Sequence, residues 1–341
     1  MRKKDILAYG LNILLPKNIF GHVKHLVSKD LIILAYHRVR NINEFKSFYY
    51  DSGLISASQD QFEYQISYIK KYFNPISEIQ LINYLYNNIS LPPQAVMVTF
   101  DDGFDDNYYY AYPILKKYAV PATMFISTSY IGQDEPIWFD WLASLFLAGS
   151  MNSIDIPLLK KVYINGNYLD NYANFHDLIK IIREIGNENR LEILSQLRDD
   201  YSAYMSHIDT SESRFMNWEQ IIELSKNDIS IGSHTVTHPI MSRLSHAEVR
   251  YELIQSKKDI ETHTLLNVNS FSYPTGQTSS FTDGIVEEVI NAGYKVAYTY
   301  IHAVNKLPIK NFYKIKRLHI ENEAHNSYFN SMMMFPAVFK D

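Results

Sequence analysis

Two adjacent aspartates, Asp101 and Asp102, directly follow the apolar run AVMVTF at residues 95–100. Neighbouring carboxylates repel each other, so this pair needs either full exposure to water or a positive charge nearby. Asp-Asp-Gly after a strand is by itself more often a turn than a site, because Asp and Gly are turn residues. The pair becomes a candidate site only if other residues of the chain help to hold a cation beside it.

His234 and His238 form a second pair, within GSHTVTHP at residues 232–239, and this pair also follows an apolar run. On a helical turn, residues four apart face the same way, so both imidazoles could reach one ion. Together with Asp102 they would make a three-ligand site with one position left for water, the usual form of a catalytic zinc site. The ion would offset the repulsion between the two acids, and Asp101 would be available as a base.

Short apolar runs alternate with amphipathic segments along most of the chain. Runs that are nearly continuous in apolar residues are typical of parallel strands buried on both faces. We expect strands at residues 31–39, 95–100, 122–128, 228–233, 269–273, 295–300 and 313–320, and helices at 60–72, 76–87, 107–117 and 245–264. The alternation predicts an α/β fold, which we interpret as a distorted (β/α) barrel of about seven strands. The carboxyl ends of barrel strands open on one face, so the acidic and histidine pairs would meet there.

Two helix starts are also predicted. Asp105 and Asp106 are interpreted structurally, as the N-terminal cap of the helix at 107–117, where the helix dipole favours acids. The helix at 245–264 opens on Ser245 and Glu248, whose spacing is that of a capping box.

The chain is predicted to have three parts. They are an N-terminal helical segment at 1–29, a discontinuous barrel at 30–141 and 218–335, and a mostly helical insertion at 142–217. The insertion interrupts the strand pattern with two sets of apolar residues at helical spacing. These are Leu178, Ile181, Ile182 and Ile185, followed by Leu191, Leu194, Leu197 and Tyr201.

The amino-acid composition limits which ligands could hold a metal and which partners the protein could bind. The 341 residues contain no cysteine, so disulfides and thiolate ligands are excluded, and a transition metal must be held by histidines and carboxylates. The formal net charge of −5 gives no electrostatic reason to expect nucleic acid as a partner.

The first residues, MRKKDILAYGLNILLPKNIF, are basic and then partly apolar. Asp5 and Asn12 interrupt the apolar stretch and no small-residue cleavage site follows, so we do not expect a signal peptide. No run approaches the ~18 apolar residues that a spanning helix needs. The segment is interpreted as a helix packed under the barrel, or as an amphipathic helix on a membrane surface near Lys17, Lys24 and Lys29. We expect a cytoplasmic location, with peripheral association with the inner membrane face as the alternative and export less favoured.

Three stretches, in this order, resemble the first three signature motifs of the polysaccharide deacetylases, carbohydrate esterase family 4. They are TFDDG at 99–103, SHTVTHP at 233–239 and FSYPTG at 271–276. YHRV at 36–39 and NWEQIIEL at 217–224 are also similar to that family, so the resemblance covers residues 30–140 and 215–320. It implies a distorted (β/α) barrel and metal-dependent removal of N-acetyl groups from amino sugars.

Carried over by position, the resemblance implies a role for each motif residue. Asp101 would be the general base, and Asp102, His234 and His238 would be the metal ligands. The backbone N–H of Thr275 would donate to the oxyanion. The implied cofactor is a divalent metal, first of all Zn²⁺, with Co²⁺, Ni²⁺ and Fe²⁺ as alternatives.

The sequence departs from the family pattern in three places. Ser272 stands where the third motif often has an arginine, and the later Asp-Trp motif has no clear match. The final Leu-x-His motif is not met, since His319 follows Leu318 directly and Arg317 occupies the leucine position. The general acid is therefore open between His319 and His37, a histidine at the end of the first strand that could protonate a leaving amine near neutral pH. His37 could equally be a core histidine bonded to a backbone carbonyl.

The leading hypothesis is a metal-dependent deacetylase acting on an N-acetylated sugar in a polysaccharide, oligosaccharide or carrier-linked glycan precursor. The insertion would restrict the site to short or carrier-linked substrates. One alternative is a catalytically impaired glycan-binding or assembly protein on the same barrel. Another is a metal-dependent amide hydrolase with a non-sugar substrate, because barrels host many chemistries. A protease of the H-E-x-x-H kind is disfavoured, since Thr235 supplies no base.

Overall fold

The computed structural model describes residues 30–41, 48–148, 153–156, 162–163, 167–322 and 326–339. The predicted helical segment at 1–29 lies outside the described residues, so its packing and its contact with a membrane stay predictions. Within the described ranges, every helix is too short or too polar to cross a bilayer.

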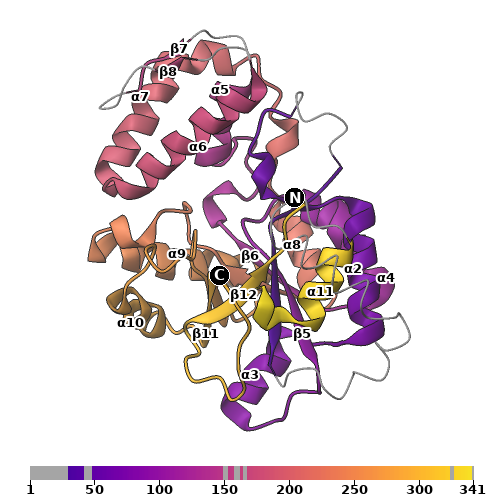
Figure 1. The fold of residues 1–341 in the computed structure, drawn as a ribbon. Coiled ribbons are helices and arrows are strands. Elements are labelled where there is room, and N and C mark those ends of the chain that lie inside the picture. Colours follow the sequence, from indigo (N-terminus) through magenta and orange to yellow (C-terminus); the bar gives the residue numbers. More distant parts are fainter. Residues whose placement is uncertain are drawn as a thin grey trace.

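Parallel strands close into a barrel at the centre of the described chain (Figure 1). They are β1 (Ile32–Tyr36), β5 (Ala95–Phe100), β6 (Ala122–Ile126), β9 (Ile229–Ser233), β10 (Ser270–Ser272), β11 (Val296–His302) and β12 (Ile315–His319). The order is β1-β12-β11-β10-β9-β6-β5, and β5 pairs back with β1. Each of the seven predicted strands supplies one barrel strand, so the predicted seven-stranded barrel is confirmed.

Short strands of the described chain also lie outside this closed ring, three of them next to β1 and β5. The predicted strand at 31–39 is split, because β2 (Arg38–Val39) leaves the barrel after β1 and pairs with β3 (Ile55–Ala57). β4 (Asn74–Pro75) pairs with the first residues of β5.

The continuous apolar runs follow from burial on both faces of each strand. In β1, Ile33 packs with Met97 and Phe125 in the cluster that fills the lower barrel, whereas Ile32 and Leu34 belong to the larger cluster beneath the helices. Every residue of β1 and β5 is buried. Burying one such side chain contributes about 1.5–3 kcal/mol, so neither face of a strand tolerates a charge without a partner.

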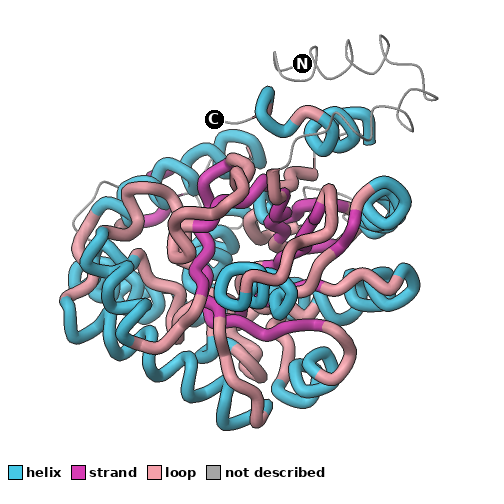
Figure 2. The backbone as a smooth tube through the Cα atoms, turned by 90° about the horizontal axis from the view of Figure 1, so that it is seen from below, coloured by secondary structure: helices cyan, strands magenta, loops and turns pink. Residues whose placement is uncertain are grey.

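Helices cover the outside of the barrel (Figure 2). They are α2 (Gln59–Tyr72), α3 (Glu78–Asn87), α4 (Tyr112–Tyr118), α8 (Trp218–Ser225), α9 (His246–Thr264), α10 (Asp283–Asn291) and α11 (Asn326–Met334). The predicted capping box is confirmed in α9, where the Ser245 N–H donates to Glu248 Oε2 at 2.7 Å and the Glu248 N–H donates to Ser245 Oγ.

The cap predicted at Asp106 is wrong. The segment begins with a π-helical turn at Asn107–Ala111, and the Asp106 side chain makes no capping hydrogen bond. Its buried carboxylate instead accepts from Arg38 Nε at 2.7 Å. The backbone carbonyl of Asp105 accepts hydrogen bonds from backbone N–H groups of the following turn. A buried guanidinium needs a charged partner, and this decides where Asp106 points.

The inserted segment is mostly helical and stands beside the barrel mouth, at the top of Figure 1. It comprises α5 (Trp138–Leu147), α6 (Tyr168–Glu184) and α7 (Asn187–Met205), with a small antiparallel pair, β7 (Ser153–Ile154) and β8 (Val162–Tyr163). The break between α6 and α7 is shorter than the predicted 186–189, because Gly186 is already the N-cap of α7.

Candidate active site

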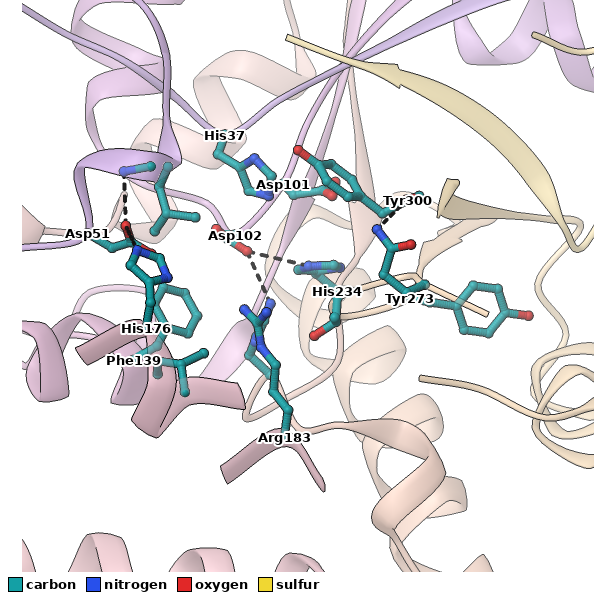
Figure 3. A pocket seen from close by; sticks show the side chains of 16 residues that line it. His37, Asp51, Asp101, Asp102, Phe139, His176, Arg183, His234, Tyr273 and Tyr300 are labelled. Atoms are coloured by element: carbon teal, nitrogen blue, oxygen red, sulfur yellow. Dashed lines mark hydrogen bonds and ion pairs between the residues drawn. The ribbon is translucent and has the colours of Figure 1, made fainter. Parts of the chain in front are cut away.

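A cavity of about 250 Å³ opens at the carboxyl ends of the barrel strands (Figure 3). Two walls enclose it. The barrel wall consists of His37, Asp101, Asp102, His234, His238, Tyr273, Thr275, Gln277 and Tyr300. The insertion wall consists of Asp51, Gly53, Leu54, Phe139, His176, Ile179 and Arg183. Of the seven residues predicted for the site, six line this cavity, and His319 does not.

The two acids sit on a sharp turn at the end of β5. The Asp101 N–H donates to the Tyr36 carbonyl at 3.0 Å and so continues the pairing with β1. Asp102 then adopts a left-handed conformation with φ of 77°, and Gly103 follows at 96°. A non-glycine residue at positive φ costs energy, and such strain clusters at functional sites. The Asp-Asp-Gly sequence is thus a turn, and the turn aims Asp102 into the cavity.

Asp102, His234 and His238 form a buried cluster that fits a metal ion. Asp102 Oδ1 lies 3.4 Å from His234 Nε2 and 3.3 Å from His238 Nε2, and one potential ligand atom from each residue lies within 4.8 Å of the others. Both oxygens of Asp102 are buried and accept no hydrogen bond from any described residue. Buried carboxylate oxygens without a hydrogen-bond partner are costly, and a cation held by this donor set would remove that cost.

The charges around Asp102 agree with that interpretation. Burial raises the pKa of Asp102, but His234 and His238 more than offset this and hold the pKa well below its usual value. The carboxylate therefore stays ionised. His234 Nδ1 lies 2.7 Å from the Ser272 carbonyl. Since a carbonyl only accepts, Nδ1 carries a proton and Nε2 faces Asp102 with its lone pair free for an ion, which is the usual arrangement of histidines around metals.

The two histidines are not on a helical turn, contrary to the prediction. Residues 234–238 form a loop in which Thr235 and His238 have positive φ, at 72° and 52°. Glu252 of α9 fixes this loop, because its Oε2 accepts from the N–H groups of Val236 and Thr237 at 2.7 and 3.0 Å. The imidazoles meet through this loop geometry and not through helical periodicity.

Asp101 is held by an arginine whose role the sequence did not reveal. Arg317 of β12 is fully buried, and its Nη1 and Nη2 each donate to one oxygen of Asp101 at 2.7 Å. Burial raises the pKa of Asp101, and Arg317 and His234 more than offset this, so the net shift is downward. Bidentate pairs of this kind fix both position and charge.

Arg317 also explains the departure at Ser272. Arg317 Nη2 donates to Ser272 Oγ at 2.9 Å, so the small serine leaves room for a guanidinium that arrives from β12. The guanidinium that the third motif often supplies is thus supplied from β12, at the position where the last motif has leucine. Reading those two departures together could have identified Arg317.

The two candidate acids have different surroundings. His37 lines the cavity, and its ring nitrogens donate to no carbonyl of the described chain, so the core-histidine alternative has no support. His319 stacks flat on Tyr300, with ring centroids 3.5 Å apart. Burial, then His302 and Arg317, lowers the pKa of His319 to about 2. A histidine with that pKa is neutral at pH 7 and lacks the imidazolium proton that a general acid donates.

Thr275 lies in the loop after β10 and has a left-handed φ of 63°. The next residue, Gly276, must be glycine: its φ is 58°, and an added Cβ would lie 2.4 Å from the Tyr300 backbone nitrogen. The Gly276 carbonyl accepts from that same nitrogen at 2.8 Å. The Thr275 N–H makes no hydrogen bond within the described residues, so it remains available to a ligand.

Comparison with known proteins agrees with this geometry. The chain is 33% identical over 153 residues to the poly-beta-1,6-N-acetyl-D-glucosamine N-deacetylase of Staphylococcus aureus, covering 39% of this chain and 52% of that protein. The namesake from Staphylococcus epidermidis is also 33% identical, over 107 residues, 30% of this chain and 37% of that protein. The chain thus spans about half the length, or less, of these curated relatives.

Solved structures share the fold. The Streptococcus pyogenes deacetylase PplD in complex with acetate matches with a TM-score of 0.59 and 19% identity, over 89% of this chain and 98% of that one. IcaB from Ammonifex degensii matches with a TM-score of 0.56 and 17% identity, over 90% and 97%. A family model described as polysaccharide deacetylase matches residues 88–297, more than half of the chain. The chain therefore belongs to the polysaccharide deacetylase family.

Proposed function

We propose that the protein is a metal-dependent deacetylase that hydrolyses the N-acetyl group of an amino sugar in a polysaccharide, oligosaccharide or carrier-linked glycan. One observation carries the proposal: the buried cluster of Asp102, His234 and His238 has unpartnered carboxylate oxygens and shares a cavity with Asp101 and Thr275. Family membership and the names of the staphylococcal relatives support it.

We propose Zn²⁺ as the metal, held by Asp102, His234 and His238. A donor set of imidazole and carboxylate without thiolate also suits Co²⁺, Ni²⁺ and Fe²⁺. When bound, such an ion polarises the amide carbonyl and makes water a usable nucleophile at neutral pH by lowering its pKa.

The remaining steps belong to the chain's own residues. Asp101 accepts the proton of the attacking water, and Arg317 keeps the carboxylate ionised and in place. The Thr275 N–H donates to the oxygen on which negative charge develops. His37 gives a proton to the leaving amine, since it lines the cavity whereas His319 lies behind Tyr300.

The test is acetate release from N-acetylhexosamine substrates presented as free oligomers, long polymer, nucleotide-linked and lipid-linked sugars. Protein stripped with a chelator is compared with protein refilled with Zn²⁺ or Co²⁺. We expect acetate release only after refilling. Asp101→Asn should lower it by about 10²–10⁴-fold, the usual contribution of a general base. Asp60→Asn, on the exposed first turn of α2, is the matched control and should not change it.

The same experiment separates the alternatives. Metal bound in a one-to-one ratio without acetate from any substrate would support a glycan-binding or assembly protein, or an amide hydrolase with another substrate. Protein that binds no metal would contradict the ligand assignment. The impaired-enzyme alternative rested partly on the missing arginine, and Arg317 now supplies that group, so the deacetylase is the better supported function.

A further inference from the structure

One face of α6 forms part of the cavity, although α6 belongs to the insertion. His176, Ile179 and Arg183 all line the cavity, and their spacing of three and then four residues places them on one face of the helix. Phe175, Leu178 and Ile182 are buried in the core of the insertion. The helix therefore presents to the cavity an imidazole, an apolar side chain and a guanidinium.

The guanidinium of Arg183 has no partner among the described side chains. Only its backbone carbonyl is engaged, by Arg243 Nε at 3.3 Å. Two other arginines of the insertion each have a side-chain partner: Arg190 Nη2 donates to Asn187 Oδ1 at 2.7 Å, and Arg198 pairs with Glu135 at 3.4 Å. Figure 3 shows the Arg183 side chain rising from α6 toward the side of the cavity that holds Asp102 and His234.

The carboxylates of the cavity are all committed elsewhere. Asp101 is bound by Arg317 through both oxygens, and Asp102 faces the two histidines of the metal cluster. Asp51 accepts from the Tyr172 hydroxyl at 2.8 Å and lies 3.6 Å from His176 Nε2. None of these three acids makes an ion pair with Arg183.

The position of Arg183 leaves its unpaired guanidinium accessible to a ligand. The residue is exposed at the cavity rim, where a ligand can reach it. Desolvation lowers the pKa of Arg183, and Asp51 only partly offsets this. A guanidinium in partly desolvated surroundings gains most from an oxyanion, whose two oxygens match its planar fork.

We propose that Arg183 binds an anionic group, a phosphate or carboxylate, that the substrate carries next to the sugar whose acetyl group is removed. The substrate's being a glycan rests on the proposed function; the anion-binding role rests on the cavity alone. A neutral N-acetylated polymer offers only hydroxyl and amide groups to this guanidinium. The insertion would thus select charged glycans at a barrel whose chemistry is the same for neutral ones.

The test measures binding without turnover. Disaccharides with a 2-hydroxyl in place of the acetamido group cannot be deacetylated, and three versions are compared by calorimetry: neutral, phosphorylated, and carrying a uronic acid carboxylate. The proteins are the metal-loaded parent chain, Arg183→Gln and Arg198→Gln. Arg198 is the matched control, because it lies in the same insertion, is paired with Glu135 and does not line the cavity.

We expect the parent chain to bind at least one charged version about 10-fold more tightly than the neutral one, as one charge-assisted contact supplies. Arg183→Gln should lose that preference and keep its affinity for the neutral version, and Arg198→Gln should keep both. The phosphate and carboxylate arms identify which anion is preferred.

Three results would overturn the proposal: equal binding of charged and neutral versions, a preference that persists in Arg183→Gln because the anion binds the metal, or an equal loss for all versions. Acetate release from the N-acetylated counterparts is measured separately. Its absence would contradict the proposed deacetylase and would leave the binding result standing.

Discussion

The two walls of the cavity are built differently. On the barrel wall, the chemical groups stand at strand ends, and buried contacts such as those of Arg317 with Asp101 and of Ser272 with His234 fix them. On the insertion wall, the groups come from α6 and from the loop at 51–54, and Arg183 has no described partner. Rigid strand ends suit catalysis, and attached loops and helices suit selection of the substrate. This difference fits the two proposals above, in which the barrel wall carries the reaction and the insertion wall selects the substrate.

A buried charge cluster attaches the insertion wall to the barrel. Arg38 of β2 donates to Asp106 at 2.7 Å and lies 3.6 Å from Asp140 of α5. Ser213 Oγ donates to Asp140 at 2.6 Å. The Asp140 carboxylate also accepts from the N–H of Asp51 at 3.2 Å, so the same cluster reaches the loop that lines the cavity.

The largest effect should come from a proposed metal ligand on the barrel wall. His234→Ala removes one of the three proposed ligands, and we expect the bound metal to fall from about one per chain to near zero. Acetate release should fall by about 10⁴-fold or more, beyond what one proton-transfer residue contributes. Metal content is measured together with the rate. His207→Ala, at an exposed position after α7, is the control, and retention of metal by His234→Ala would contradict the ligand set.

The next largest effect should come from Arg317. Arg317→Met leaves the buried Asp101 carboxylate without its partner, and removing one partner of a buried pair costs about 3–5 kcal/mol of unfolding free energy. Activity should also fall by about 10–100-fold, as for other groups that orient catalytic side chains. Urea unfolding and kcat measure the two effects.

A relocated arginine sharpens this prediction. In the double variant Ser272→Arg with Arg317→Ser, the guanidinium returns to the third-motif position that the family often uses. We expect part of both losses to be recovered, because Ser272 Oγ and Arg317 already touch. A double variant no better than Arg317→Met would mean that β12 is the only position from which an arginine can hold Asp101 here.

The sequence predicted the parts of this molecule that depend on local pattern. Strands buried on both faces leave continuous apolar runs, and the residue types at their ends identified Asp102 and His234 as candidates. Thr275 was named only through the resemblance to the polysaccharide deacetylases. Arg317 could not be seen in the same way, because it meets Asp101 across 216 residues of chain through the closure of the barrel. The loop at 234–238 likewise depends on Glu252 of a later helix.

The insertion wall escaped prediction for another reason. Helical spacing indicated α6 but not which face it turns toward the barrel, since that depends on how the insertion docks. The docking uses Arg38, Asp106 and Asp140, and Asp106 had been interpreted as a helix cap. Buried ion pairs between distant segments leave no periodic signal in a sequence.

The docking cluster should make stability depend on pH. Burial raises the pKa of Asp140 to about 6, although Arg38 and Ser213 oppose this. The folded state therefore binds the proton more tightly than the unfolded state, whose Asp has a pKa of about 3.9. The resulting contribution is complete below about pH 4 and is lost as pH rises through about 6, with a size of about 3 kcal/mol.

Asp140→Asn should remove this dependence. We expect the parent chain to lose about 3 kcal/mol of unfolding free energy relative to Asp140→Asn when the pH rises from 4 to 7. Asp177→Asn is the control, since Asp177 lies on the same insertion, is exposed and pairs only with Lys180. A constant difference across this range would show that Asp140 is not protonated in the fold near pH 5.

The smallest effect should come from the loop that joins the two walls. The Tyr172 hydroxyl of α6 donates to Asp51 at 2.8 Å and accepts from the Gly53 N–H at 3.1 Å. Tyr172→Phe should cost about 1–2 kcal/mol of stability and raise KM by about 10-fold at most, with kcat unchanged, because the loop lines the cavity and supplies none of the groups proposed for the reaction.

Tyr201→Phe is the control for Tyr172→Phe, because it removes a hydroxyl group from the same insertion at a site away from the cavity. The Tyr201 hydroxyl accepts from the Asp155 N–H at 3.0 Å, so the variant loses a similar hydrogen bond in the same insertion, away from the cavity. A similar stability loss with unchanged KM is expected. If Tyr172→Phe lowered kcat instead of raising KM, the insertion wall would take part in the reaction itself, and the separation of reaction from specificity between the two walls would be wrong.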